Sequence, residues 1–253
     1  MTQVHRIRVD IWIDYACPYS WLHTTTIDAF RAVYGAGVEV HWHPFEMRPE
    51  PEPLPSPDAP SRHEAWAQRL YPLALERGVS LRMPPLYVRS RLAFEVASWA
   101  SDHGRFDAVH RALFEAYFGR GEDIGDIDTL VRIATSRDDE ANELRHALEQ
   151  GWYASRIERH KAMAARLGVD GIPFTVISRA EQRPVQYAGA PASQPIAPVV
   201  LRGVAPLSHF HEAVRVLFPD GYLATPSRDG ASWDPVPTDA AERADSGSVE
   251  QPS

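Results

Sequence analysis

The sequence contains a single cysteine, Cys17, among its 253 residues. One cysteine cannot form an intramolecular disulfide, and it cannot supply the several thiolates of a structural zinc site. No run approaches the roughly 18 apolar residues of a membrane helix. The first residues also lack the basic segment and apolar run of a signal peptide. We therefore expect a cytoplasmic protein with no membrane partner and no metal.

Positive charge is also scarce. The chain has 34 acidic residues against 26 lysines and arginines, which gives a formal net charge of −8. Proteins that bind nucleic acids or anionic membranes present basic patches. The charge balance therefore argues against a nucleic-acid partner.

Proline is abundant, with 22 residues, and seven of them lie between Pro44 and Pro60. Such a density indicates a long connection without regular secondary structure. From Ala224 onward the chain has few apolar residues and an excess of acidic ones. We expect this end, residues 224–253, to be a disordered acidic tail.

The order of elements follows from the hydrophobic spacing. Residues 4–13 alternate as in a strand, helical spacing follows from Pro18 to Tyr34, and residues 38–43 alternate again. This β–α–β unit predicts a parallel pair of strands. Residues 62–168 show helical spacing almost throughout. Strand signals return at 174–177, 184–188 and 198–203, and a last helix is expected at 209–217.

Cys17 is the strongest candidate for chemistry, because it lies where the first strand meets the first helix. The free N–H groups and the dipole of a helix start favour a negative charge. We expect a thiol there to have a lowered pKa, and the Ser20 hydroxyl, one turn on, to donate a hydrogen bond to the sulfur. Asp14 is a candidate proton acceptor, and the alternative is a strand-end or N-cap role. The alternative for Cys17 is an inert core residue.

A second candidate is Pro173, in the run Gly-Ile-Pro-Phe at 171–174 between a helix and a strand. A proline at a strand start is compatible with a cis or a trans peptide bond, and the residues alone favour trans.

Two further groups of residues have plainer interpretations. His41 and His43 share one face of the second strand, and we expect a solvated face rather than a metal site. Trp99, Tyr117 and Trp152 could line a cleft, but their helical spacing favours the core.

Residues 14–22, DYACPYSWL, and residues 164–177, AARLGVDGIPFTVI, together resemble the DsbA-like branch of the thioredoxin fold. Shorter likenesses lie at 43–48 (HPFEMR) and 202–214. The resemblance is to FrnE-type oxidoreductases, with kappa-class glutathione transferases and 2-hydroxychromene-2-carboxylate isomerases as more distant relatives. It implies an α/β, thioredoxin-like fold with an inserted all-helical domain. The expected parts are 1–60 and 169–223 for the thioredoxin-like domain and 61–168 for the helical insertion.

The resemblance also implies roles for individual residues. Cys17 takes the position of the family's nucleophilic cysteine, with Ser20 beside it, and Pro173 takes the position of its cis-proline. The residues expected to contact a thiol or substrate are Pro18, Tyr19, Trp21 and Ile172.

Ser20 departs from the dithiol pattern, which has cysteine at that position. Without a second thiol, a mixed disulfide at Cys17 needs an external thiol for its release. We therefore expect a monothiol thiol-disulfide oxidoreductase with a CPYS motif. Its external thiol would be a low-molecular-weight one such as glutathione or mycothiol, acting on a small-molecule or disulfide substrate.

Two alternatives remain open. One is a glutathione- or mycothiol-dependent transferase or isomerase acting on a small aromatic or polyketide-like molecule, in which Cys17 only donates a hydrogen bond. The other is a non-catalytic protein that binds a small ligand. We expect no tightly bound cofactor in any of these cases, and a homodimer is one possible assembly.

Overall fold

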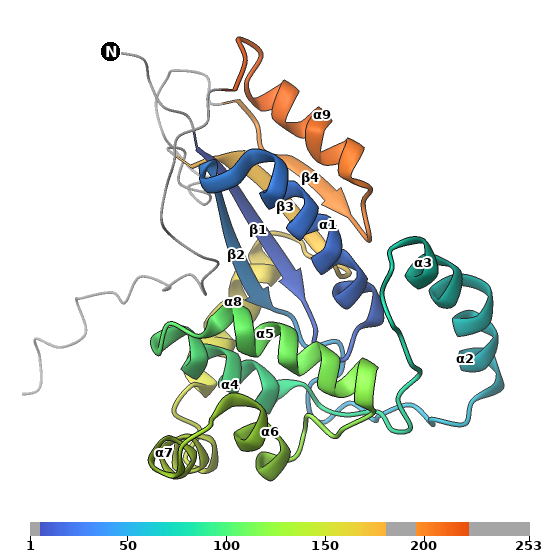
Figure 1. Ribbon diagram of the computed structural model, residues 1–253, viewed down its shortest axis with the longest axis vertical. Coiled ribbons are helices and arrows are strands. Elements are labelled where there is room, and N and C mark those ends of the chain that lie inside the picture. The colour runs from blue at the N-terminus through green and yellow to red at the C-terminus, as the bar shows by residue number, and fades with distance from the viewer. Residues whose placement is uncertain (1–5, 181–195, 223–253) are drawn as a thin grey trace, which may run out of the picture.

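Four strands form one mixed sheet in the computed structural model, which describes residues 6–180 and 196–222 (Figure 1). The strands are β1 (Ile7–Ile13), β2 (Val38–Pro44), β3 (Phe174–Arg179) and β4 (Val199–Arg202). They lie in the order β2-β1-β3-β4, with β1 parallel to β2 and the other neighbours antiparallel. This arrangement is a thioredoxin-like α/β fold, as the sequence predicted.

The first three elements form the predicted β–α–β unit. Helix α1 (Pro18–Tyr34) connects β1 to β2 through a short 3-10 turn, η1 (Gly35–Gly37). Ile7 pairs with Val38 and Ile13 with Pro44. The alternating apolar residues of β1 share a core cluster with residues of α1. Helices cover both faces of the sheet, so the polar residues of β1 are also largely buried (Figure 1).

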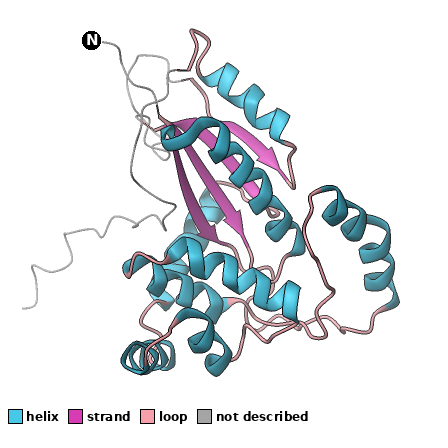
Figure 2. Cartoon of the chain, viewed as in Figure 1, coloured by secondary structure: helices cyan, strands magenta, loops and turns pink. Residues whose placement is uncertain are grey.

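The segment between β2 and β3 is helical, as predicted (Figure 2). Its elements are α2 (Pro60–Ala65), η2 (Trp66–Leu70), α3 (Tyr71–Glu76), α4 (Arg91–Asp102), α5 (Phe106–Phe114), η3 (Glu115–Arg120), α6 (Ile127–Ala134), α7 (Asp138–Glu149) and α8 (Ala154–Arg166). Both η2 and η3 are π-helical turns that continue the preceding helix.

The helices surround the end of the sheet where α1 begins. The arrowheads of β1 and β2 point toward α4, α5 and α6, and the α2–α3 pair stands beside the start of α1 (Figure 1). Helix α8 packs against β2. The division of the chain into domains at residues 60, 168 and 223 stays a prediction.

The chain closes with β4 and α9 (Leu207–Leu217), which packs with α1 on one face of the sheet. The predicted strand at 184–188 and the predicted disordered tail lie outside the described residues. Within the described part of the chain, no helix is both long and apolar enough to cross a membrane.

Two expectations about side chains are wrong. His43 is buried rather than solvated: its Nε2 lies 2.8 Å from Asp10 Oδ1 and its Nδ1 lies 3.1 Å from His160 Nδ1. Trp152 does not lie in the core, because 56% of its surface is exposed. Trp99, in contrast, is fully buried, as its helical spacing predicted.

Candidate active site

Cys17 lies at the N-cap of α1, where the chain turns from the sheet into the helix. The turn closes through the Cys17 N–H, which donates to the Asp14 carbonyl at 3.0 Å. Pro18 follows at the first helical position, where a proline loses no hydrogen bond. The local sequence thus fixes the sulfur beside the free N–H groups of the first turn.

Asp14 braces this turn. Its Oδ1 accepts from the Ala16 N–H and its Oδ2 from the Met47 N–H, both at 2.8 Å. The carboxyl is buried, and burial raises its pKa although these hydrogen bonds oppose the shift. Because both oxygens accept backbone N–H groups, Asp14 holds the turn to the segment after β2. This is the strand-end role that the sequence allowed, since the N-cap of α1 is Cys17 and no side chain caps that helix.

The Cys17 thiol is 3% exposed, and burial raises its pKa from 9.0 to about 11. Hydrogen bonds from the Ser20 hydroxyl and from the Ser20 and Tyr19 N–H groups act in the opposite direction but do not offset burial. The nearby Asp14 carboxylate raises the pKa further. The expectation of a lowered pKa is therefore wrong for the free protein, because the sulfur is more deeply buried than a helix start alone implies.

A cavity of about 420 Å³ opens beside Cys17. Its volume suits a small molecule rather than a folded partner. The wall is formed by the turn before α1, the proline-rich segment, α2 with η2, the loop before α4, and η3. Its lining residues are Asp14, Ala16, Cys17, Pro18, Tyr19, Met47, Arg48, Leu54, Pro55, Ala59, Ser61, Arg62, Ala65, Trp66, Leu70, Pro84, Tyr87, Val88, Ser90, Tyr117 and Phe118.

Five of the predicted site residues gather at this cavity. Cys17, Pro18 and Tyr19 line it directly. Ser20 is buried behind them, and its hydroxyl also accepts the Asp14 N–H at 3.3 Å. Trp21 stands behind the wall, stacked on the lining residue Phe118 with ring centroids 5.5 Å apart.

The other two predicted residues do not line the cavity. Ile172 and Pro173 precede β3, whose first residue, Phe174, pairs with Trp12 near the end of β1. Ile172 and Pro173 therefore lie at the same end of the strands as the turn from β1 to α1. The Ile172–Pro173 peptide bond is cis, the geometry that the resemblance implies. The Pro173 carbonyl accepts the Gly203 N–H at 2.9 Å, and Ile172 packs toward Trp12 and Phe174.

Sequence reasoning missed most of the wall opposite Cys17. The π-helical turns supply four lining residues: Trp66 and Leu70 from η2, Tyr117 and Phe118 from η3. Such turns occur often at functional sites. Tyr117 is the exception, because its spacing allowed a position in a cleft or in the core, and it is a buried residue of the cavity wall. Trp66 could have been suspected from its position as an aromatic residue in a helix flanked by prolines. Nothing in the residue spacing indicated the π-helical turns.

No group of three or more metal-binding side chains occurs within residues 6–180 and 196–222.

Comparison with known proteins identifies the family. The DSBA-like thioredoxin domain model matches residues 8–196. A relative from Bacillus subtilis (strain 168), the uncharacterized protein YwbO, is 30% identical over 150 residues, which cover 58% of this chain and 74% of the relative.

Solved structures share the fold. The probable DsbA oxidoreductase SCO1869 from Streptomyces coelicolor superposes with a TM-score of 0.66 at 21% identity, covering 92% of this chain and 100% of its own. A 2-hydroxychromene-2-carboxylate isomerase gives 0.59 at 15% identity over 84% and 97% of the two chains. The cytosolic disulfide reductase DsbM from Pseudomonas aeruginosa, solved with GSH, gives 0.52 at 14% over 68% and 88%. With the family model matching most of its length, the chain belongs to the DSBA-like thioredoxin domain family.

Proposed function

We propose that the protein is a monothiol thiol-disulfide oxidoreductase in which Cys17 exchanges with a small disulfide bound in the cavity. The observation that carries the proposal is the position of the Cys17 sulfur. It lies on the wall of a small-molecule cavity, at the N-cap of α1, with hydrogen-bond donors from Tyr19 and Ser20 around it. Family membership and oxidoreductase neighbours support an enzyme in general.

The reaction has two balanced steps. The Cys17 sulfur attacks one sulfur of a bound disulfide, RSSR, and forms Cys17–S–SR, while the leaving RS⁻ takes up the proton that Cys17 has lost. A second small thiol, R′SH, then attacks the mixed disulfide, releases RSSR′ and restores the Cys17 thiol. Ser20 cannot perform this second step, since it has no sulfur.

The donors around the sulfur have a defined task in these steps. Negative charge passes over the sulfur during each exchange, and the N–H groups of the first turn stabilise it there. The Ser20 hydroxyl adds a third donor. Cys17 and Ser20 would therefore carry the chemistry, with Pro18 and Tyr19 forming the wall against which the ligand rests.

The raised pKa of Cys17 limits its reaction with solutes that do not bind. A thiol with a pKa near 11 holds about a hundredfold less thiolate at pH 7 than one with a pKa of 9.0, but its thiolate is the better nucleophile. The two effects leave exchange about tenfold slower than for an ordinary thiol. Exchange would then be confined to disulfides that the cavity holds against the sulfur.

Glutathione is a candidate for the external thiol, because the neighbour DsbM was solved with GSH. A single cysteine is also typical of proteins in a reducing, cytoplasmic compartment, where such thiols are abundant.

The test is steady-state reduction of a small disulfide by a small thiol, with the protein at catalytic concentration. We expect turnover above the uncatalysed exchange for wild type and none for Cys17→Ser. Ser20→Ala should retain turnover at a reduced rate, because one of the donors to the sulfur is lost. Equal turnover by wild type and Cys17→Ser would refute the monothiol mechanism.

A second function is favoured by the raised pKa of Cys17. If the thiol stays protonated, it can donate a hydrogen bond to the sulfur of a bound thiol cofactor, as expected for a transferase or isomerase. In that case Cys17→Ser keeps much of the activity on a small aromatic substrate, because serine also donates. A protein that only binds ligands would show turnover in neither assay.

A further inference from the structure

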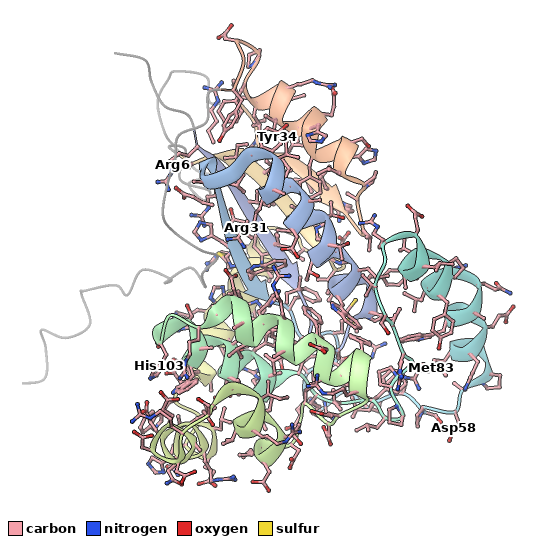
Figure 3. All side chains as sticks on the ribbon, viewed as in Figure 1. Arg6, Arg31, Tyr34, Asp58, Met83 and His103 are labelled. Carbon is pink, nitrogen blue, oxygen red and sulfur yellow. The ribbon has the colours of Figure 1, made fainter. Side chains whose placement is uncertain are left out.

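Arg62 lies in the cavity wall, and its Nε has no hydrogen-bond partner. The side chain is 8% exposed, and this nitrogen is buried. Each of its terminal nitrogens donates one hydrogen bond, one to the Pro57 carbonyl at 2.9 Å and the other to the Pro84 carbonyl at 2.8 Å. Figure 3 labels Asp58, which follows Pro57, and Met83, which precedes Pro84, so the two segments that hold Arg62 can be found there. The guanidinium is therefore held in a fixed position.

The charge of Arg62 is also unmatched. Within the described ranges, no carboxylate forms an ion pair with it, and both carbonyl partners are neutral. The Tyr87 ring, whose centroid lies 4.5 Å from the Arg62 Cζ, gives only a cation–π contact. A buried cation without a counter-ion and with an unpartnered N–H is costly, and an anionic group bound in the cavity would offset that cost.

The cavity wall near Cys17 carries a negative charge, that of Asp14. Asp14 belongs to the turn that carries Cys17, and its carboxylate already acts unfavourably on a negative sulfur. An anionic group is therefore repelled near Cys17 and attracted near Arg62. Arg48 also lines the cavity, but it is exposed and faces Glu52 at 3.8 Å, so water screens its charge.

We propose that Arg62 binds the carboxylate of a small thiol or disulfide whose sulfur meets Cys17. The substrate class is thus an anionic small thiol or its disulfide, oriented with its sulfur toward α1 and its carboxylate toward α2. The Cys17 half of this inference rests on the proposed function. Arg62 itself is a binding residue and requires only an anion in the cavity.

This assignment separates the two external thiols considered above. Glutathione carries two carboxylates, whereas mycothiol carries none. A cavity with Arg62 in its wall would favour glutathione, or another carboxylate-bearing thiol, over a neutral one.

The test compares two disulfides of similar size, anionic 3,3′-dithiodipropionate and neutral bis(2-hydroxyethyl) disulfide. The rate constant for adduct formation at Cys17 is measured with each by intact mass, and their ratio is taken for every variant. An unfolded chain would expose Cys17 and react with both disulfides as an ordinary thiol, so the ratio is compared only between variants that circular dichroism shows to be folded.

We expect Arg62→Gln to lower the anionic-to-neutral ratio about tenfold or more, since a charge-assisted hydrogen bond is lost. Arg62→Lys keeps the charge and should retain most of the preference. Arg69→Gln, an exposed arginine of the same helical run, is the matched control and should leave the ratio unchanged. The same ratio in wild type and in folded Arg62→Gln overturns the assignment.

A binding measurement separates this proposal from the proposed function. Adipate has the two carboxylates but no sulfur, and 1,6-hexanediol is its neutral counterpart. We expect adipate alone to raise the Tm of wild type and to slow iodoacetamide labelling of Cys17. If neither disulfide reacts but adipate stabilises wild type and not Arg62→Gln, the exchange function fails and the anion site stands. If both disulfides react and adipate has no effect, the anion site fails alone.

If Arg62→Gln does not fold, the wild-type protein still decides the question. Adipate protection that exceeds 1,6-hexanediol protection, and that weakens as salt rises, supports the site. Equal protection by the two compounds overturns it.

Discussion

The Tyr15 hydroxyl lies 2.9 Å from His110 Nδ1, and this contact ties the turn that carries Cys17 to α5. Burial raises the Tyr15 pKa well above its usual value and lowers the pKa of His110 from 6.5 to about 3. Tyr15 therefore stays protonated and His110 stays neutral, and the two share one buried hydrogen bond through Nδ1. The turn that carries Cys17 is thus held by a buried hydrogen bond between two residues that lie 95 positions apart in the sequence.

Tyr15→Phe tests the strength of this link. The substitution leaves His110 Nδ1 buried without a hydrogen-bond partner, so we expect a loss of about 1–3 kcal/mol in the free energy of unfolding, measured by urea denaturation. Tyr34→Phe is a matched control, because its hydroxyl also lies 2.9 Å from an Nδ1, that of His211, but at the half-buried contact of α1 with α9 (Figure 3). Water can replace that partner, so its loss should be smaller. Equal losses would contradict the role of burial.

Acid should destabilise the protein through its buried histidines. Burial lowers the pKa values of His23 and His110 from 6.5 to about 3, so between these values the unfolded chain binds more protons than the folded one. Stability is then lost as pH falls from about 6.5 toward 3, by up to about 1.4 kcal/mol per pH unit for each histidine.

The measurement is urea unfolding across this range. We expect His110→Gln, whose amide can donate to or accept from Tyr15, to flatten the pH dependence relative to wild type. His63→Gln, at an exposed position, should leave the slope as it is. A His110→Gln slope as steep as that of wild type would show that His110 is protonated in the folded protein.

The reactivity of Cys17 should follow its raised pKa. We expect the rate of iodoacetamide labelling to rise about tenfold per pH unit from pH 7 to 10, without a plateau, because the thiolate appears only near pH 11. Ser20→Ala removes a hydrogen bond that lowers the pKa, so labelling at a given pH should slow. A plateau below pH 9 would contradict the effect of burial.

Asp10 anchors a buried network between β1, β2 and α8. It accepts two hydrogen bonds from Arg8, at 2.7 and 2.8 Å, and one from His43, which in turn contacts His160. Asp10→Ala leaves His43 Nε2 without its partner in a buried site, and we expect a loss of about 3–5 kcal/mol.

The control for Asp10→Ala is Glu39→Ala. Glu39 is also a strand carboxylate paired with an arginine, Arg6 at 2.7 Å, but both side chains are partly exposed. Its removal should cost less than about 1 kcal/mol. Comparable losses for the two variants would mean that the Asp10 network adds nothing beyond a surface pair.

The opening β–α–β unit was predictable because its signals are local. The alternation of residues 4–13, the proline at 18 and the glycine that ends α1 each act within a few residues. The same holds for Cys17 at a helix start. The residues around the Ile172–Pro173 bond allowed a cis or a trans peptide and favoured trans. Only the family resemblance implied the cis form that the structure has.

The features that sequence reasoning missed depend on contacts across the chain. His43 alternates like a solvated residue, and only α8, which brings His160 against it, makes that face of the strand buried. The sequence around Arg62 indicates a surface arginine, and only the fold brings the carbonyls of Pro57 and Pro84 against its guanidinium. The predicted direction of the Cys17 pKa shift was wrong for the same reason. The helix start is a local feature, but the burial that raises the pKa comes from the helices around it.

The central claim is that Cys17 forms a covalent disulfide with a bound small thiol. Intact mass measurement after incubation with glutathione disulfide tests it most directly, with Cys17→Ser as the control. The account predicts one added glutathione per chain in wild type, reversed by free thiol, and none in the control. An unmodified wild-type protein, under conditions in which free cysteine reacts completely, would contradict it.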